Sequence, residues 1–238
     1  MTQGHGGDER AACDDVATGA AEAITSRRSV RAYLDRPVAR ATIEDILRIA
    51  AQAPSGSNIP PWRVHVLTGA PLERLRRAMR DAFLAGAKHE REYKYYTDPV
   101  FEPFLARQRA CGWGLYGTLG IGRGDRDKSR AYRATNYEFF GAPIGMIFTI
   151  DRRLELGSWL DYGMFLQSIM VAARGFGLHT CPEASIAEFH GIIRAQLDVP
   201  DGEMVICGIA LGYADPEATI NGFRTERETI EAFATFHE

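Results

Sequence analysis

The amino-acid sequence predicts a single α+β domain. Short apolar runs rich in β-branched residues alternate with longer stretches whose apolar residues recur at helical spacing. The chain has 238 residues, 45% of them hydrophobic, which suffices for one sizeable core or for a core completed by a second subunit. No internal repeat or low-complexity linker divides it. We therefore expect one folded unit over residues 14–238, preceded by a loose polar tail over 1–13.

The composition argues against several classes of protein. Lys and Arg total 28 and Asp and Glu total 31, a net charge of −3, whereas nucleic-acid-binding domains usually carry a basic excess. The four cysteines are scattered, without the spacing of a zinc site or a disulfide framework. No apolar run reaches about 18 residues, and the first dozen residues lack the apolar stretch of a signal peptide. We therefore expect a cytoplasmic protein without metal, nucleic-acid or membrane partners.

The first half of the domain is predicted to contain three helices and one strand. Residues 14–25 favour a helix with acidic residues in its first turn. Residues 42–53 place apolar side chains on one helical face, with Thr42 as the N-cap and a proline directly after the end. WRVHVLTG, residues 62–69, alternates like a strand, and residues 71–84 favour a third helix.

The second half begins with a long polar and aromatic stretch, residues 86–138, which has the least regular pattern. Two apolar β-type runs follow at 142–151 and 204–215, with a short strand and turn at 178–185. The remaining pattern favours two helices, at 158–177 and 186–197. The first of these helices is apolar nearly all round, which indicates burial, for example at a subunit interface.

The segment GWGLYG, residues 112–117, has the glycine spacing of a loop that binds a dinucleotide pyrophosphate. Such a loop follows a strand and opens a helix. Here the preceding residues, FEPFLARQRAC, are charged and helix-like, and no parallel βαβ pattern surrounds the glycines. We interpret GWGLYG as a flexible loop and not as a cofactor site.

Three short polar segments are candidates for ligand binding. In SRRSVRAY, alternate residues of an extended chain would place Arg27, Ser29 and Arg31 on one side, where guanidinium groups could hold an anion. NGFRTERE supplies a second basic pair, Arg224 and Arg227. APSGSNIPPW offers hydroxyl, amide and backbone donors before a rigid exit. Taken singly, each segment is equally compatible with a solvated surface turn or an ordinary connection.

Five segments, taken together and in order, resemble the FMN-dependent nitroreductase family over nearly the whole chain. They are RRSVRAY at 27–33, APSGSNIPPW at 53–62, NYEFFGAPIGMIFT at 136–149, GLHTCPEAS at 177–185 and LGYADPEATINGFRTERE at 211–228. An additional stretch at about 86–135 makes the chain most similar to the enzymes of that family that reduce nitrobenzoate-like and dinitroaromatic compounds.

The resemblance implies an α+β sandwich with a mixed, mainly antiparallel sheet, assembled as an intertwined homodimer with FMN at the subunit interface. By this resemblance, the first arginine segment and the C-terminal pair hold the phosphate, and a loop from the partner subunit closes the site. An asparagine reads the flavin pyrimidine edge, and a turn faces the ring near N5. The implied cofactor-binding residues are Arg27, Arg28, Ser29, Arg31, Pro54, Ser55, Gly56, Ser57, Asn58, Asn136, Pro182, Glu183, Ala184, Ser185, Arg224 and Arg227.

The resemblance also implies the reaction. NAD(P)H passes a hydride to the flavin, leaves, and is replaced by a nitroaromatic compound that is reduced to the nitroso and hydroxylamine forms, with no catalytic side chain required. The insertion at about 86–135 is expected to cover the substrate, because electron-poor rings stack on aromatic faces and an arginine attracts a carboxylate. The candidate substrate residues are Tyr93, Tyr96, Phe104, Arg107, Trp113 and Tyr116.

Two alternatives remain open on the sequence. The same fold and flavin could serve reductive dehalogenation or flavin cleavage by oxygen. A non-enzymatic flavin-binding protein is the third possibility.

Overall fold

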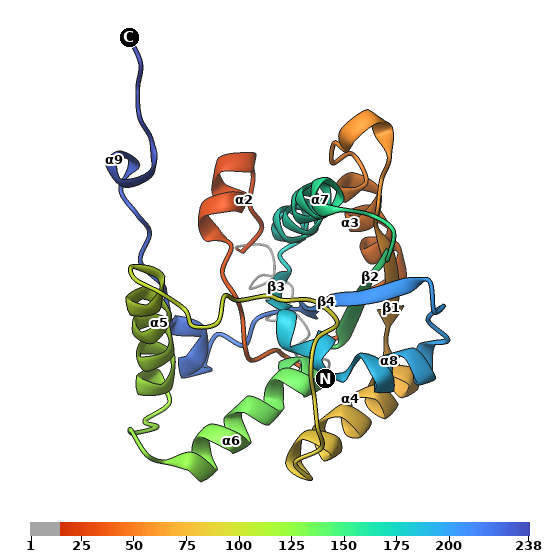
Figure 1. Ribbon diagram of the computed structural model, residues 1–238, viewed down its shortest axis with the longest axis vertical. Helices are drawn as coiled ribbons and strands as arrows, with labels where there is room; N and C mark the ends of the chain where they lie inside the picture. Colours follow the sequence, from red (N-terminus) through yellow and green to blue (C-terminus); the bar gives the residue numbers. More distant parts are fainter. Residues whose placement is uncertain (1–14) are drawn as a thin grey trace, which may run out of the picture.

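A four-stranded antiparallel sheet lies at the centre of the computed structural model, which describes residues 15–238 (Figure 1). Its strands are β1 (Arg63–Leu67), β2 (Ile144–Asp151), β3 (His179–Glu183) and β4 (Glu203–Gly212), in the order β1-β2-β4-β3. Every pairing between these strands is antiparallel, and β2 pairs with β4 along its whole length apart from one irregularity. The three strong β-type runs of the sequence therefore form the three strands β1, β2 and β4.

Helices cover both faces of the sheet and create two apolar cores. On one face α4 (Gly69–Leu84) and α8 (His190–Leu197) pack against the sheet, and on the other α3 (Arg40–Ala50) and α7 (Leu156–Arg174) do so. Strand β2 supplies Ile147 to the first core and alternate residues, such as Phe148, to the second. Because both faces are buried, this strand reads as a continuous apolar run.

The close packing on the first face requires glycine at one position of β2. A Cβ added to Gly145 would lie 2.7 Å from Cδ1 of Leu72 and 3.1 Å from the Phe139 ring. Phe139 is completely buried and has a φ of 52°, in the left-handed region. The ring of Phe139 and the side chain of Leu72 on α4 therefore occupy the space that a side chain at Gly145 would need.

Two helices were predicted to begin at the wrong residues. Helix α2 (Ala20–Ser26) begins six residues later than expected, because Thr18 ahead of it bonds Glu22 through its backbone N–H at 2.7 Å and its hydroxyl at 2.8 Å. Helix α3 begins at Arg40, with Ala39 and not Thr42 at the N-cap position. Thr42 lies in the first turn instead.

The stretch with the least regular pattern contains two helices, α5 (Phe104–Thr118) and α6 (Arg126–Ala134). The interpretation of GWGLYG as a flexible loop is wrong, since all six residues lie within α5. Helix α5 has no buried residue, so it lacks the amphipathic pattern that marks a helix in a sequence. Asp125 caps α6 by accepting a hydrogen bond from the backbone N–H of Lys128.

The remaining elements are short, and the C-terminal segment extends away from the body (Figure 1). They are η1 (Gly56–Asn58), η2 (Thr135–Gly141), η3 (Ala184–Phe189), η4 (Thr219–Gly222) and α9 (Ile230–Phe233). The helix expected over 186–197 is thus divided into η3 and α8. In the part of the chain described, no helix combines the length and apolar character needed to cross a membrane. The predicted tail, residues 1–13, lies outside the described residues.

Candidate active site

The first arginine segment runs along the free edge of β3. Ser29 forms a parallel bridge with Thr180, and the backbone N–H of Val30 donates to the Thr180 carbonyl at 3.1 Å. Further on, Tyr33 bridges Ala214 in the antiparallel sense. The segment is therefore extended, which is the conformation assumed when Arg27, Ser29 and Arg31 were placed on one side. It lies between β3 and the chain that follows β4.

A buried asparagine joins the two ends of the chain beside this edge. The side-chain oxygen of Asn221 accepts the backbone N–H of Arg31 at 2.8 Å. Its amide nitrogen donates to the carbonyls of Ala32 at 2.8 Å and of Asp215 at 2.9 Å. Asn221 is only 5% exposed, so these three bonds fix the start of the C-terminal segment against the first arginine segment.

Arginines from both ends of the chain converge at this place. Burial lowers the pKa of Arg27, and the neighbouring charge of Arg227 lowers it further. Burial likewise lowers the pKa of Arg28, and the charge of Arg224 adds to the effect. Two cationic pairs, each formed across the ends of the polypeptide, therefore face the same region.

These arginines form no ion pairs among residues 15–238, although the charge of Asp15 acts on Arg28. None of Arg27, Arg28, Arg31, Arg224 and Arg227 forms an ion pair there. The Nε atom of Arg28 is buried without a hydrogen-bond partner in the described part of the chain. Since an unpaired buried donor is costly, this group of arginines is suited to an anionic ligand that supplies the missing acceptors.

The turn after β3 combines a buried carboxyl group with an anchored backbone. Glu183 is 4% exposed, and neither of its oxygens has a hydrogen-bond partner within residues 15–238. Burial raises the pKa of this carboxyl group well above its usual range, although the charges of Arg31 and Arg76 act in the opposite direction. The carbonyl of Ala184 accepts a hydrogen bond from Nε of Arg91 at 3.1 Å.

A cavity of about 370 Å³ adjoins this turn and is lined largely by aromatic side chains and the turn itself. Among its lining residues are Tyr93, Trp159, Pro182, Ala184 and Cys207. The Tyr93 and Trp159 rings lie 4.8 Å apart, and the Tyr93 hydroxyl donates to the carbonyl of Ile206. Tyr93 is the one predicted substrate residue that borders this cavity.

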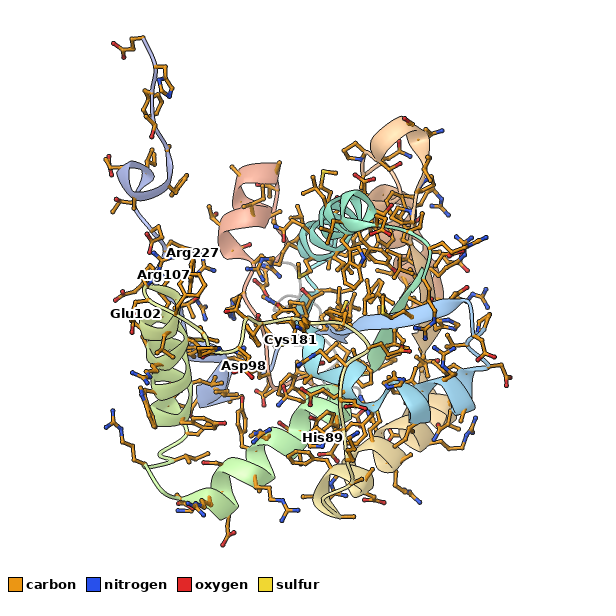
Figure 2. All side chains as sticks on the ribbon, viewed as in Figure 1. His89, Asp98, Glu102, Arg107, Cys181 and Arg227 are labelled. Carbon is orange, nitrogen blue, oxygen red and sulfur yellow. The ribbon has the colours of Figure 1, made fainter. Side chains whose placement is uncertain are left out.

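Four of the other predicted substrate residues lie on α5, where the Arg107 guanidinium stacks over the Phe104 ring at 5.5 Å. Tyr96, Phe104 and Trp113 are exposed, and Tyr116 packs edge-on against Tyr132 at 6.1 Å. Arg107 forms an ion pair with Glu228 at 2.8 Å, so its charge is already partnered. Figure 2 shows Arg107 beside Arg227 at one end of α5.

The loop predicted to come from a partner subunit does not reach the arginines of its own chain. Its residues, Pro54, Ser55, Gly56, Ser57 and Asn58, are mostly exposed. The backbone N–H of Gly56 donates to Oδ2 of Asp161 on α7 at 3.0 Å. In Figure 1 the loop lies at the far end of α3, on the other side of α7 from α2 and the C-terminal segment.

The remaining predicted site residues are Asn136 and Ser185. Asn136 lies in η2 and donates through its side chain to the carbonyl of Arg133 at 3.0 Å. Ser185 is half-buried in η3, next to Ala184. Sequence reasoning did not single out Asn221, although it opens the NGFRTERE segment, and it missed Arg91, because single polar residues carry no periodic signal.

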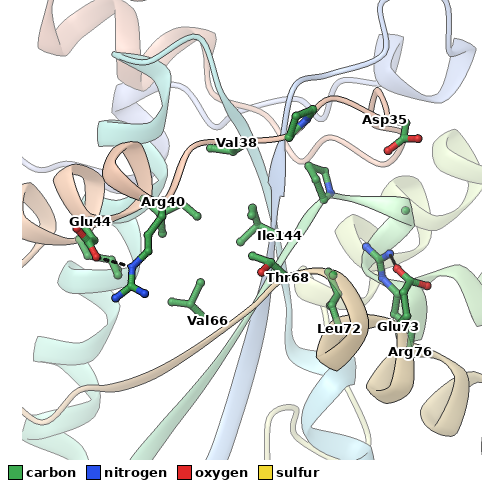
Figure 3. A pocket seen from close by; sticks show the side chains of 16 residues that line it. Asp35, Val38, Arg40, Glu44, Val66, Thr68, Leu72, Glu73, Arg76 and Ile144 are labelled. Carbon is green, nitrogen blue, oxygen red and sulfur yellow. Dashed lines mark hydrogen bonds and ion pairs between the residues drawn. The ribbon is translucent and has the colours of Figure 1, made fainter.

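A larger cavity, of about 800 Å³, lies elsewhere, beside the edge strand β1 and between α3 and α4 (Figure 3). Four of its charged residues form ion pairs, Arg40 with Glu44 at 2.7 Å and Arg76 with Glu73 at 2.5 Å, and Asp35 also lines it. The rest of its wall is largely apolar, including Val66. No group of His, Cys, Asp and Glu side chains within the described residues is arranged to hold a metal ion.

The sheet covered on both faces defines an α+β protein, and the converging arginines form a group suited to an anionic ligand. The chain belongs to the nitroreductase family, whose model matches residues 24–213. The resemblance drawn from the five sequence segments, and the α+β fold it implied, are thereby confirmed.

Named relatives agree with this assignment. The chain is 41% identical over 217 residues to the 4-nitrobenzoate reductase of Pseudomonas putida, covering 90% of this chain and 93% of that protein. It is also 41% identical to the chloronitrobenzene nitroreductase of Comamonas testosteroni, covering 90% and 96%. The crystal structure of the FMN and NADPH-dependent nitroreductase NfnB from sphigopyxis sp. strain HMH superposes with a TM-score of 0.89 at 34% identity, covering 92% and 99%.

Proposed function

We propose that this protein is an FMN-dependent oxidoreductase that uses NAD(P)H to reduce nitroaromatic compounds. The observation that carries the proposal is the convergence of Arg27 and Arg28 with Arg227 and Arg224, none of which forms an ion pair within residues 15–238. Relatives at 41% identity are named as nitrobenzoate and chloronitrobenzene reductases, which favours nitroarene reduction over dehalogenation, flavin cleavage or passive flavin binding.

The residues present fit FMN. Its phosphate would accept hydrogen bonds from the four converging arginines at positions 27, 28, 224 and 227. The Nε–H group of Arg28, which has no hydrogen-bond partner in the described residues, is a donor of the required kind. Ser29 is adjacent to these arginines, and Arg31, which also lacks an ion pair within residues 15–238, would serve the polar edge of the flavin together with Asn136. The backbone of Pro182, Glu183, Ala184 and Ser185 would face the ring.

The protein supplies binding and orientation to the reaction. FMN, when bound, supplies hydride transfer between NAD(P)H and the acceptor. The guanidinium groups hold the phosphate end, and the bond from Arg91 to the Ala184 carbonyl fixes the turn that borders the aromatic cavity. Tyr93 and Trp159 offer aromatic faces on which an electron-poor nitroarene can stack. Burial raises the pKa of Glu183, which favours its neutral form beside this cavity.

We further propose that the active form is an intertwined homodimer in which the 54–58 loop of one subunit completes the site of the other. Large apolar side chains are exposed on α7, where Leu156 is 83% and Leu160 is 71% exposed. Phe233 and Phe236 in the extended C-terminal segment are similarly exposed, at 71% and 78%. Exposed apolar surface of this kind marks a protein interface. The free thiols of Cys111, Cys181 and Cys207 suit a reducing cytoplasm.

Substitution of the phosphate-binding arginines tests the proposed site. Arg27→Ala combined with Arg227→Ala should yield protein without bound FMN, because each change removes a charge-assisted contact of about 1.5–3 kcal/mol. The measurement is the flavin absorbance of the purified protein and its FMN titration. Arg74→Ala, which removes an exposed arginine of α4, is the matched control. Full flavin occupancy in the double variant would contradict the site.

The reaction is tested separately with the unmodified protein. Steady-state assays with NADH and NADPH should show reduction of nitrobenzoate and no release of halide from a halogenated phenol. Rapid bleaching of the flavin by NADPH in the absence of oxygen would rule out passive flavin binding. A protein that binds FMN but reduces no nitroarene would contradict the proposed substrate class.

A further inference from the structure

The GWGLYG segment of α5 packs against the C-terminal segment that carries the second arginine pair. A Cβ added to Gly114 would lie 2.7 Å from Cε2 and 3.3 Å from Cζ of the Phe223 ring, which is closer than real side chains approach. Phe223 immediately precedes Arg224. In Figure 1 the blue C-terminal segment runs beside α5, and α5 contacts η4, which directly precedes Phe223. The glycine therefore permits a close approach between the helix and this segment.

A second contact joins α5 to the same segment beyond Arg227. The Arg107 guanidinium, in the first turn of α5, pairs with the Glu228 carboxylate at 2.8 Å. The two contacts thus bracket residues 223–228, which contain both arginines of the C-terminal pair.

Little else holds residues 223–228 in position. They form no helix or strand, and the Arg227 guanidinium bonds only to Thr225 and Glu226 of its own segment. Within residues 15–238, the Arg107–Glu228 pair is the only hydrogen bond or ion pair that connects this segment to an element outside the C-terminal stretch 219–238. Arg224 also donates to the carbonyl of Asn221, which is fixed against the first arginine segment, so α5 supplies the remaining support for the direction of Arg224 and Arg227.

We propose that α5 is a brace for the phosphate-binding arm, with Gly114 and Arg107 as positioning residues that keep Arg224 and Arg227 facing Arg28 and Arg27. This inference rests on the proposed FMN function. It assigns GWGLYG a role in cofactor binding that differs from a pyrophosphate loop: the helix does not contact the ligand but holds the segment that does. It also accounts for the ion pair of Arg107, which was expected to attract substrate.

The helix itself offers a matched set of variants. Gly112 and Gly117 lie in the same helix, and a Cβ at either position would meet nothing within 4 Å. Alanine favours a helix over glycine at all three positions, so none of the substitutions should weaken α5. Only Gly114→Ala would push Phe223 and the adjoining arginine away.

The experiment is an FMN titration of flavin-depleted full-length protein, followed by the quenching of FMN fluorescence. Gly114→Ala should raise the FMN dissociation constant about ten- to a hundredfold, as expected for the loss of one charge-assisted contact. Gly112→Ala and Gly117→Ala should bind FMN like the unmodified protein. Far-UV circular dichroism and thermal unfolding would show that all three variants fold.

A rescue experiment separates positioning from general damage. Once Phe223→Ala has removed the ring, adding Gly114→Ala should cause no further loss of FMN affinity. Unchanged affinity in Gly114→Ala, equal losses in the two control variants, or additive losses in the double variant would each overturn the proposal. If Gly114→Ala binds normally while Arg27→Ala and Arg227→Ala lose FMN, the brace alone is wrong. If the arginine variants also bind normally, the proposed phosphate site is wrong.

Discussion

At the scale of single residues, Glu183 is a buried acid whose environment favours its neutral form. It lies at the end of β3 with 4% of its surface exposed, and neither oxygen has a partner within residues 15–238. Burial raises its pKa despite the charges of Arg31 and Arg76, because a carboxylate loses more solvation on burial than a carboxylic acid does. A neutral acid at this position leaves the cationic charge of the neighbouring arginines available to a ligand.

The raised pKa predicts how stability depends on pH. The folded protein binds a proton at Glu183 that the unfolded chain releases above its ordinary pKa of 4.5. This contribution to stability is fully present below pH 4.5 and is lost as the pH rises through the pKa of the folded state. In urea unfolding from pH 4 to pH 8, the free energy of unfolding should therefore fall less for Glu183→Gln than for the unmodified protein. At pH 8 the variant should be the more stable by about 1–3 kcal/mol.

Glu44→Gln, at an exposed position of α3, provides the control for the loss of one carboxyl group. Identical pH profiles for Glu183→Gln and the unmodified protein would show that Glu183 is ionised in the folded state.

At the scale of elements, the turn η3 is held by a residue from the chain that leaves α4. Arg91 donates to the Ala184 carbonyl at 3.1 Å and pairs with Glu188 at 2.7 Å. The Tyr137 hydroxyl donates to the other oxygen of Glu188 at 2.7 Å. The side chains of Arg91 and Glu188 are 20% and 17% exposed. This network connects three segments around the turn that borders the aromatic cavity.

Loss of this connection should be measurable as instability. Arg91→Ala is expected to lower the free energy of unfolding by about 1–3 kcal/mol, because Glu188 keeps its charge but loses its cation in a largely solvent-shielded place. Arg91→Lys should lose less, since it retains the charge but not the two separate donors. Chemical denaturation measures both values. Equal stability of all three proteins would mean that the turn is held by other contacts.

The elements also show what a sequence pattern can reveal. The strands β1, β2 and β4 were predictable because their side chains meet apolar cores. The second half of helix α5 was missed because the helix has no buried residue and its glycines suggested a loop, although the residues before them were recognised as helix-like. The arginines were found because they cluster in motifs. The structural role of Asn221 was not predicted. Two of its hydrogen bonds join it to residues about 190 positions earlier in the chain, and the third joins it to Asp215, so they leave no local pattern in the sequence.

At the scale of the whole molecule, one chain holds only part of the proposed site. Arg27, Arg28, Arg224 and Arg227 converge beside β3, whereas the 54–58 loop lies against α7 and beyond it (Figure 1). The exposed apolar residues Leu156 and Leu160 lie at the start of α7, the end of the helix at which Asp161 contacts the loop. A second copy packed on α7 would bring the loop of one subunit to the arginines of the other, and binding of FMN would then be coupled to assembly.

This coupling is tested by charging the exposed face of α7. Leu156→Lys with Leu160→Lys should abolish the dimer. Each subunit would place two ammonium groups in an apolar interface, where they lose their hydration and face the same two groups of the partner subunit. Sedimentation velocity should then report a monomer, and FMN affinity should fall at least about tenfold, as expected when a subunit's polar contacts to the ligand are lost.

Leu84→Lys is the control, since Leu84 is a partly exposed leucine of α4 on the opposite face of the sheet from α7. A dimer that survives both lysines would move the interface away from the start of α7. A monomer that binds FMN normally would show that the 54–58 loop is not part of the site, because the loop reaches the arginines only from another subunit.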